Sequence, residues 1–275
     1  MVNEEQTSMW NGPAGQAWVD AQETLDRLFT PFEALLVAEL AATGAQRVLD
    51  VGCGTGSTTL AAARKTGTDG HATGVDLSEP MLALARHRAA REQLRAEFIV
   101  GDAQTHAFEP AYFDLVISRF GVMFFENPIQ AFANLRRATR AGGQMRCIAF
   151  RSAAENPFMT TAERAAVPLL PDLPARRPDA PGQFAFADPQ RVQAILEDSG
   201  WSDIHIEPID LTCAMPEAAL DQYLARLGPV GQALRGADEA TRTRVVEVVR
   251  AAFEPYVAAG EASFSAACWM MAARA

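Results

Sequence analysis

Short apolar segments alternate with helix-like segments between residues 45 and 150, and this alternation constrains the fold of the chain more than any other feature. We expect strands at 48–51, 72–75, 97–100, 113–118 and 143–150. Helices are expected between them at 57–64, 78–91 and 129–139. Strands that are separated by helices form a parallel sheet with helices on both faces. The pattern therefore predicts an α/β fold with a doubly wound, mostly parallel sheet.

Beyond residue 150 the sequence changes character. Six prolines fall between residues 168 and 189, which is typical of a covering loop or cap. A helix at 188–200 has an N-cap residue, Asp188, followed by a proline in its first turn, and it ends at Gly200. Two late strands are expected at 201–211 and 264–272, with a cap helix around 245–253 between them.

Composition narrows the classes of function. The chain has 275 residues, 49% of them hydrophobic, and 34 acidic residues against 24 basic ones give a net charge of −10. Without a run of Lys and Arg to neutralise phosphates, we expect no nucleic-acid partner. No apolar segment reaches the ~18 residues of a membrane span and no secretory signal is seen, so we expect no membrane partner. Four scattered cysteines predict reduced thiols in a cytoplasmic protein without a metal site.

The sequence LDVGCGTG, at 49–56, places Asp50 at the end of the first expected strand and glycines directly after it. The carboxyl end of a strand is where an open α/β sheet binds its ligand, and glycines let the backbone approach that ligand closely. A dinucleotide motif would need glycine at the position of Ser57. An acid beside the loop offsets the charge of a sulfonium ligand with an amino group, whereas it repels a pyrophosphate.

Two further acids end the next two expected strands. Asp76 is placed to accept hydrogen bonds from both ribose hydroxyls of an adenosine, as it would also be in an NAD enzyme. Asp102, in the sequence VGDA, is placed to accept the adenine amino group while the N–H of Ala103 faces a ring nitrogen. Asp102 alone fits an ordinary turn equally well. Acids at three successive strand ends together predict an adenosine-containing, cationic ligand.

The segments VLDVGCGTG, GVDLSEPML, FIVGDAQ, FDLVISRFGVMFF and LRRATRAGGQ resemble, in this order, the class I S-adenosylmethionine-dependent methyltransferases. The resemblance covers residues 45–151 and is strongest to the small-molecule enzymes of the ubiquinone and menaquinone biosynthesis group. It implies the Rossmann-like fold of that family, with seven strands, the last antiparallel, and S-adenosylmethionine as the cofactor. The residues that it assigns to the cofactor site are Asp50, Gly52, Cys53, Gly54, Gly56, Asp76, Leu77, Met81, Asp102, Ala103 and Ser118.

Within that set, each part of the cofactor has its own residues. By the resemblance, the methionine end falls to Asp50, Gly52 and Gly54, the ribose to Asp76, the adenine to Leu77, Met81, Asp102 and Ala103, and the sulfonium side to the backbone of Ser118. Cys53 fits a small packing residue, with a catalytic thiol as the alternative. The resemblance also divides the chain into a helical lid (1–44), a cofactor-binding core (45–151), a cap insertion (152–187), a core helix and sixth strand (188–212), a second helical cap insertion (213–262) and a seventh strand (263–275).

The acceptor side carries weaker signals. Its candidates follow the fourth expected strand or lie on an N-terminal helical stripe, and they are Trp18, Gln22, Arg119, Phe120, Met123 and Phe124. Aromatic residues at helical spacing fit core packing equally well. Candidates for a catalytic group are Arg119 and His106, although His106 also fits an ordinary surface loop. The Asn/Asp-Pro-Pro-aromatic signature of methyltransferases that act on amides or base amines is absent from this segment.

We therefore predict S-adenosylmethionine-dependent methyl transfer to an O, N, S or C nucleophile of a small molecule. The reaction would be an in-line displacement that produces S-adenosylhomocysteine, with most of the catalysis from positioning and exclusion of water. An NAD-dependent oxidoreductase is the alternative enzyme class, and a catalytically silent cofactor-binding or interaction protein is the other alternative. The acceptor, the atom that is methylated and the formation of a homodimer are left open.

Overall fold

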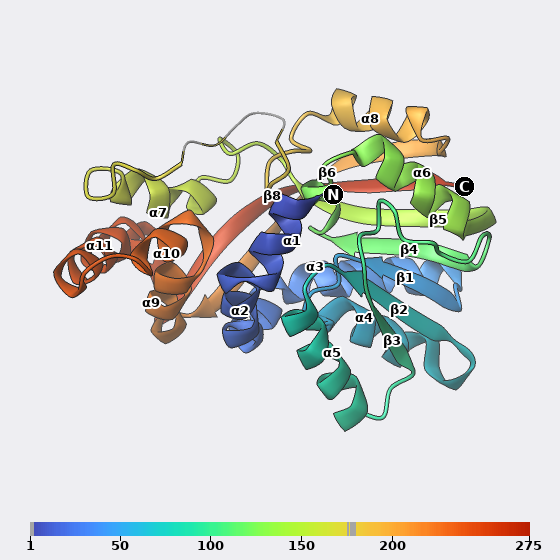
Figure 1. The fold of residues 1–275 in the computed structure, drawn as a ribbon, viewed down its shortest axis with the longest axis horizontal. Helices are drawn as coiled ribbons and strands as arrows, with labels where there is room; N and C mark the ends of the chain where they lie inside the picture. Colours follow the sequence, from blue (N-terminus) through green and yellow to red (C-terminus); the bar gives the residue numbers. More distant parts are fainter. Residues whose placement is uncertain (1–2, 175, 177–179) are drawn as a thin grey trace.

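The computed structural model describes residues 3–174, 176 and 180–275. A single twisted sheet crosses the molecule in the strand order β3-β2-β1-β4-β5-β8-β6 (Figure 1). Its strands are β1 (Arg47–Val51), β2 (His71–Asp76), β3 (Ala96–Val100), β4 (Phe113–Arg119), β5 (Thr139–Phe150), β6 (Ser202–Pro216), β7 (Val257–Ala258) and β8 (Glu261–Arg274). The first five are parallel, and β8 pairs antiparallel with both β5 and β6. The predicted doubly wound sheet with one reversed strand is confirmed, with the two-residue β7 added to the seven expected strands.

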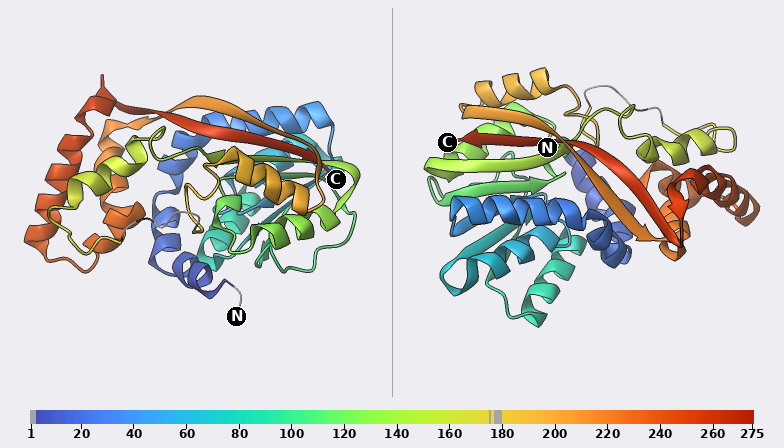
Figure 2. Two further views of the ribbon diagram at one scale, coloured as in Figure 1. Left: turned by 90° about the horizontal axis from the view of Figure 1, so that it is seen from above. Right: turned by 180° about the vertical axis from the view of Figure 1, so that it is seen from behind.

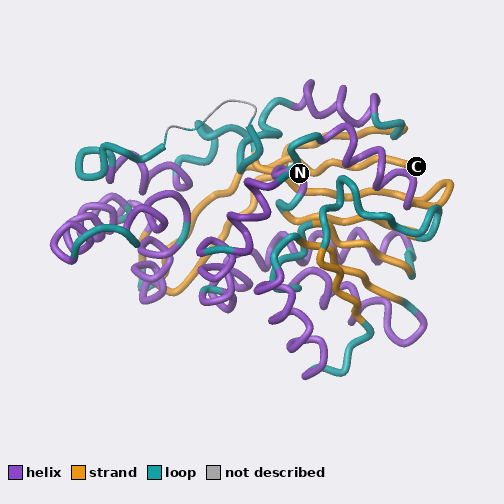
Figure 3. Tube along the Cα trace, viewed as in Figure 1, coloured by secondary structure: helices purple, strands orange, loops and turns teal. Residues whose placement is uncertain are grey.

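Helices cover both faces of this sheet (Figures 1 and 3). Those on one face are α3 (Gln22–Thr43), α4 (Ser57–Thr66) and α5 (Glu79–Arg91), and those on the other are α6 (Pro128–Ala138) and α8 (Pro189–Asp198). Three of the helices begin in the same way. Ser78, Asn127 and Asp188 each accept a backbone N–H with the side chain, and a proline stands in the first turn. The helix starts predicted at Ser78 and Asp188 are thus confirmed.

The remaining helices gather beyond one end of the sheet (Figure 2). They are α1 (Glu4–Asn11), α2 (Pro13–Asp20), α7 (Phe158–Ala166), α9 (Glu217–Arg226), α10 (Gly228–Leu234) and α11 (Glu239–Ala252). Strands β6 and β8 leave the sheet side by side and run as a two-stranded ribbon to α9 and α11 (Figures 1 and 2). The structure thus has helices from the N-terminus and from the segments after β5 and β6 at the same end of the molecule.

Three strand boundaries lie three or more residues from those predicted. The last two strands were expected at 201–211 and 264–272, but they continue to Pro216 and start at Glu261, because they pair with each other beyond the sheet. The fifth strand was expected at 143–150 after a helix that ends at 139. It begins at Thr139, which pairs with Phe113, and the ladder then shifts register around the Gly142–Gly143 turn. No helix in the described part of the chain is both long and apolar enough to cross a membrane.

Candidate active site

The three predicted acids come together at the carboxyl edge of the sheet. Asp50 and Asp76 lie in the neighbouring strands β1 and β2, and Asp102 follows β3, the next strand in the sheet. Parallel strands end at the same edge, which is why positions far apart in the sequence become neighbours here. The loop after β1 is fastened to the end of β2, because the N–H groups of Gly52 and Cys53 donate to the Val75 carbonyl at 2.9 and 3.2 Å.

The three glycines of the loop all adopt left-handed backbone conformations, with φ between +54° and +87°. Two of them also lie against other parts of the chain. A Cβ on Gly52 would stand 2.5 Å from the Cα of Gly121, and one on Gly56 would stand 2.8 Å from the Cβ of Ala85. Gly54 is more open, since the nearest atom to such a Cβ is the Met81 sulfur at 3.7 Å. Internal packing therefore requires Gly52 and Gly56, and Gly54 is the one whose surroundings leave most room for a ligand.

Asp76 organises the loop that follows β2. Its Oδ2 accepts the N–H of Gly54 at 2.8 Å and its Oδ1 accepts the N–H of Ser78 at 2.9 Å. Burial raises the pKa of this carboxyl, and hydrogen bonding to the backbone of Ser78, Gly54 and Leu77 counteracts the shift. The carboxyl of Asp76 thus serves first to hold the backbone of the two loops.

The loop after β3 is covered by the N-terminus. Asp102 accepts the backbone N–H of Gln104 at 2.9 Å through Oδ1, and the Gln104 side-chain amide donates to both of its oxygens at 3.1 and 2.9 Å. The Asn3 side-chain amide also donates to Oδ2, at 3.2 Å. Ala103 is buried, and its carbonyl accepts the side-chain amide of Asn134 at 2.9 Å. His106 belongs to this same loop, where its ring packs edge-on against Phe108, and it is therefore on a different strand end from Arg119.

Leu77, Met81 and Cys53 are the remaining side chains predicted for the cofactor site. Met81 is buried, and Leu77 is half-buried with its carbonyl accepting the Asn11 side-chain amide at 2.8 Å. Cys53 is buried next to Gly74, and burial raises the pKa of its thiol well above the usual range. A protonated, enclosed thiol is a poor nucleophile, which favours the packing interpretation of Cys53.

Charged side chains lie close to the methionine end of the predicted cofactor site. Asp50 is 1% exposed and accepts the Thr59 hydroxyl at 2.7 Å. Burial raises its pKa to about 7, with Thr59 and Arg119 acting in the opposite direction. The Arg119 guanidinium lies 3.4 Å from the Ser57 hydroxyl and 5.6 Å from the centre of the Phe29 ring. Its pKa is lowered by burial and raised in turn by nearby acids of α3 and by Asp50. Arg119 thus belongs to a cluster of opposite charges.

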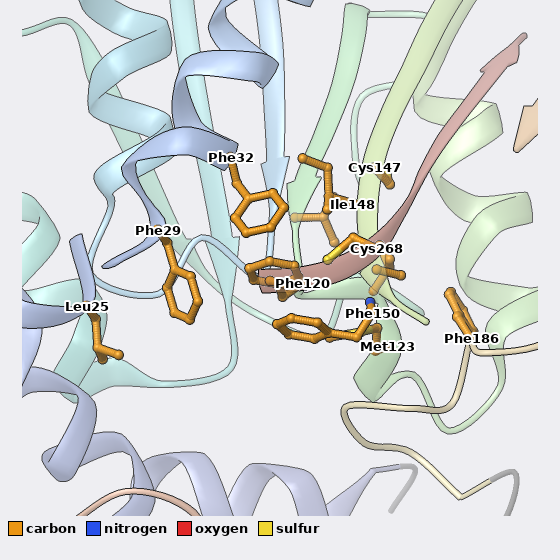
Figure 4. Packing of buried hydrophobic residues seen from close by; sticks show 14 of the residues in the cluster. Leu25, Phe29, Phe32, Phe120, Met123, Cys147, Ile148, Phe150, Phe186 and Cys268 are labelled. Carbon is orange, nitrogen blue, oxygen red and sulfur yellow. Dashed lines mark hydrogen bonds between the residues drawn. The ribbon is translucent and has the colours of Figure 1, made fainter. Parts of the chain in front are cut away.

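The segment after β4 turns sharply against the glycine loop. The Ser118 hydroxyl donates to the Val51 carbonyl at 2.7 Å and accepts the N–H of Gly121 at 3.1 Å. Phe120, between them, has a left-handed backbone with φ of +69°, which is uncommon for a bulky residue and is found most often near functional sites. Its ring stacks on Phe150 with 4.2 Å between centroids (Figure 4).

The acceptor candidates divide into two groups. Phe120 and Met123 are buried in the aromatic cluster drawn in Figure 4, so packing accounts for both. Trp18 and Phe124 are half-buried, and Trp10 joins them through edge-on contacts at 6.0 and 5.3 Å between centroids. The amide of Gln22, another acceptor candidate, donates to Asp26 at 2.6 Å.

Sequence reasoning missed several residues around this site. Asn3 and Asn11 reach the loops after β3 and β2 from the N-terminal helices, and Asp26 and Arg88 form an ion pair beside the glycine loop. Asp26 and Arg88 are 62 positions apart in the sequence, so no local motif predicts their ion pair. The helical stripe that contains Gln22 continues to Asp26 one turn later, and this spacing is the only sequence signal that points to it.

Comparisons with known proteins identify the family of the chain. Residues 48–143 match a family model described as a methyltransferase domain. The chain is 34% identical over 187 residues to the aklanonic acid methyltransferase DauC of Streptomyces sp. (strain C5), covering 64% of this chain and 84% of that protein. It is 30% identical over 178 residues to the demethylmenaquinone methyltransferase of Renibacterium salmoninarum, covering 62% and 72%.

A solved structure with a similar fold is the O-methyltransferase of a trans-AT PKS multienzyme from Brevibacillus brevis, in complex with S-adenosyl-L-homocysteine. The TM-score is 0.52, the sequence identity is 17%, and the match covers 88% of this chain and 72% of that one, so this likeness concerns the fold. The chain belongs to the class I S-adenosylmethionine-dependent methyltransferases. It is an enzyme that transfers a methyl group from S-adenosylmethionine to a small-molecule acceptor, as predicted in preference to the oxidoreductase.

Proposed function

We propose that the strand-end acids hold S-adenosylmethionine in the order in which their strands lie in the sheet. Asp50 and the glycine loop would take the methionine end, Asp76 the ribose, and Asp102 with Ala103 the adenine edge. The observation that carries this proposal is Asp76. Its two oxygens hold the loop at the end of β2, and an ionised carboxylate there is suited to accept hydrogen bonds from the hydroxyls of a ribose. Leu77 and Met81 would pack against the adenine, and the Ser118 backbone would line the sulfonium side.

The charge of the site supports a cationic cofactor. Asp26, Glu33 and Asp50 act on Arg119, and Arg88 is the other cation of the group. With all five groups ionised, three acids and two bases leave one negative charge. That excess favours a ligand whose sulfonium and ammonium groups outweigh its carboxylate. When bound, S-adenosylmethionine supplies an activated methyl group that the acceptor takes by in-line displacement.

We propose an apolar, ring-containing acceptor. The half-buried rings of Trp10, Trp18 and Phe124 at the edge of the lid are suited to packing against such a molecule. The two curated relatives described above are named for aklanonic acid and for demethylmenaquinone, which is a quinone. Segments 1–44, 152–187 and 213–262 would act as a lid and cap that exclude water from the reaction.

The chain's own residues then act mainly by positioning. The protonated Cys53 thiol is unsuited to act as a base, and His106 lies with Asp102 on the adenine side of the proposed site. Arg119 would hold charge near the reacting centre. The four buried, free cysteines support a cytoplasmic location. The mass of the protein in solution would decide between a monomer and a homodimer.

Calorimetric titration with S-adenosylmethionine, S-adenosylhomocysteine and NADH tests the proposed cofactor site. We expect the first two to bind the wild-type chain and NADH to give no signal. In Asp76→Asn, the loss of a charged hydrogen-bond acceptor should weaken both complexes at least about tenfold. Asp188→Asn is the matched control, because Asp188 accepts the N–H two residues ahead at 2.9 Å, as Asp76 does, but at the start of α8. Wild-type affinity in Asp76→Asn would refute the assignment.

We also expect S-adenosylmethionine to bind more tightly as the pH rises from about 6 to about 8. Burial raises the pKa of Asp50 to about 7, so below that pH a cationic ligand must first displace the proton, and Kd should rise by up to about tenfold per pH unit. The ligand-free protein responds in the opposite direction: the stability that the protonated carboxyl provides is complete below 3.8, the pKa without burial, and is lost as the pH passes about 7.

Calorimetry across this pH range, with Asp50→Asn as the comparison, measures the effect. The variant cannot ionise at this position, so its Kd should lose the dependence on pH. A wild-type Kd that stays constant over the range, or an equal slope in Asp50→Asn, would contradict the role of Asp50.

A further inference from the structure

One face of α5 follows the glycine loop. Met81, Ala85 and Arg88 stand at helical spacing on this face. A Cβ on Gly54 would stand 3.7 Å from the Met81 sulfur, and one on Gly56 would stand 2.8 Å from the Cβ of Ala85. Arg88 makes a direct polar contact, because its Nη1 donates to the Thr55 carbonyl at 2.7 Å. Arg88 is therefore the point at which α5 fixes the backbone of the loop by a hydrogen bond.

The same guanidinium also reaches α3, which belongs to the segment proposed as the lid. Arg88 Nη2 lies 2.5 Å from Asp26 Oδ2 on α3, and Gln22 donates to that same oxygen at 2.6 Å. The two charged side chains are only 13% and 22% exposed, so the pair is screened less by solvent than a surface pair. One planar group thus connects the lid helix, the glycine loop and α5.

We propose that Arg88 is a positioning residue for the cofactor, which it does not touch. By donating in two fixed directions, to Thr55 and to Asp26, it holds the glycine loop and the lid helix α3 in the arrangement that receives the methionine end. This inference rests on the proposed cofactor site at the glycine loop. An arginine suits the task because its planar fork holds both acceptors at once, whereas the single ammonium of a lysine cannot keep the same geometry.

A second polar contact attaches α3 to the core independently of Arg88. Further along α3, Glu33 accepts the Ser57 hydroxyl at the start of α4. That contact joins α3 to α4, but it does not involve the Thr55 carbonyl of the glycine loop. Loss of the Arg88 pair should therefore loosen the loop and the first part of α3 while α3 stays attached to the core. The expected result is weaker cofactor binding in a protein that is still folded.

The test compares Arg88→Lys, Asp26→Asn and the double variant by calorimetry with S-adenosylmethionine and S-adenosylhomocysteine. We expect Kd for both ligands to rise about tenfold in Arg88→Lys, the effect of a lost charge-assisted hydrogen bond. Asp26→Asn should give a smaller rise. The Kd of the double variant should be little higher than that of Arg88→Lys alone, because both substitutions remove the same ion pair between Arg88 and Asp26. The urea unfolding midpoint of each variant, measured without ligand, shows whether the fold is retained.

Arg64→Lys is the matched control. Arg64 on α4 makes a bidentate pair with Glu92, just after α5, at 2.8 Å for both contacts, but this pair is more exposed and does not reach the loop. Its Kd should stay within about twofold of wild type. An unchanged Kd in both Arg88→Lys and Asp26→Asn, or an equal rise in Arg64→Lys, would overturn the inference. If the wild type itself bound neither ligand, or if Asp76→Asn bound normally, the proposed cofactor site would fail instead.

Discussion

Gly52→Ala should lose S-adenosylmethionine binding and lower the free energy of unfolding by about 2–5 kcal/mol. The φ of +67° at this position costs an L-residue roughly 1–2 kcal/mol. The added Cβ would also stand 2.5 Å from the Cα of Gly121. Because that neighbour is backbone, no side chain can turn away, and the two loops must separate at a further cost of about 1–3 kcal/mol. Urea denaturation and calorimetry measure the two effects.

Gly142→Ala separates the two causes. Gly142 has a similar φ of +73°, but no atom lies within 4 Å of its Cβ position. This variant should therefore show only the conformational cost of about 1–2 kcal/mol, and its cofactor affinity should equal that of the wild type. Equal stability losses at the two positions would mean that the contact between Gly52 and Gly121 contributes nothing.

Asn156→Ala should destabilise the protein by about 1–3 kcal/mol, since it leaves the buried N–H of Ala267 without a partner. The Asn156 side chain accepts the N–H of Ala267 at 2.9 Å and donates to the Ala267 carbonyl at 2.9 Å and to the Ser152 carbonyl at 3.1 Å. It is fully buried where the chain has left β5 and has not yet begun α7. The Asn156 side chain therefore pairs with the backbone of β8 at Ala267, in the way that a neighbouring strand would. The midpoint of urea unfolding reports the loss.

Asn11→Ala is the control with a similar set of hydrogen bonds in a different environment. The Asn11 side chain donates to the carbonyls of Thr7 and Leu77 and accepts the N–H of Glu79. Because Asn11 is exposed, water can replace these partners, and the loss should stay below about 1 kcal/mol. A loss as large as that of Asn156→Ala would show that burial does not set the cost.

Much of the core could be predicted because its signals are local. The strands and the acids at their ends, Asp50, Asp76 and Asp102, each stand in a short segment that determines its own structure, and the sheet brings those ends together. The glycines were predicted for a ligand alone, whereas packing against Gly121 and Ala85 also requires two of them. That second reason depends on where β4 and α5 lie, which the loop sequence does not contain.

The acceptor side and the cap could not be predicted to the same depth. Asp26 and Arg88 meet across 62 positions, and Asn156 meets Ala267 across 111. Phe120 and Met123 illustrate a different difficulty, because the same apolar side chains serve a binding site or a core, and here they pack among other buried aromatic residues. Their role in acceptor binding stays a prediction, as do those of Trp18, Gln22, Arg119 and Phe124.

The ribbon formed by β6 and β8 determines how this enzyme can diversify. The chain enters the helical segment after Pro216 and returns at Glu261, and these two residues are paired at the tip of the ribbon (Figure 1). A segment whose ends are adjacent can be exchanged without altering the strands that carry it. At this tip, one set of helices could therefore replace another while the strands of the sheet stay unchanged. Such an exchange would leave the strands that carry Asp50 and Asp76 unchanged.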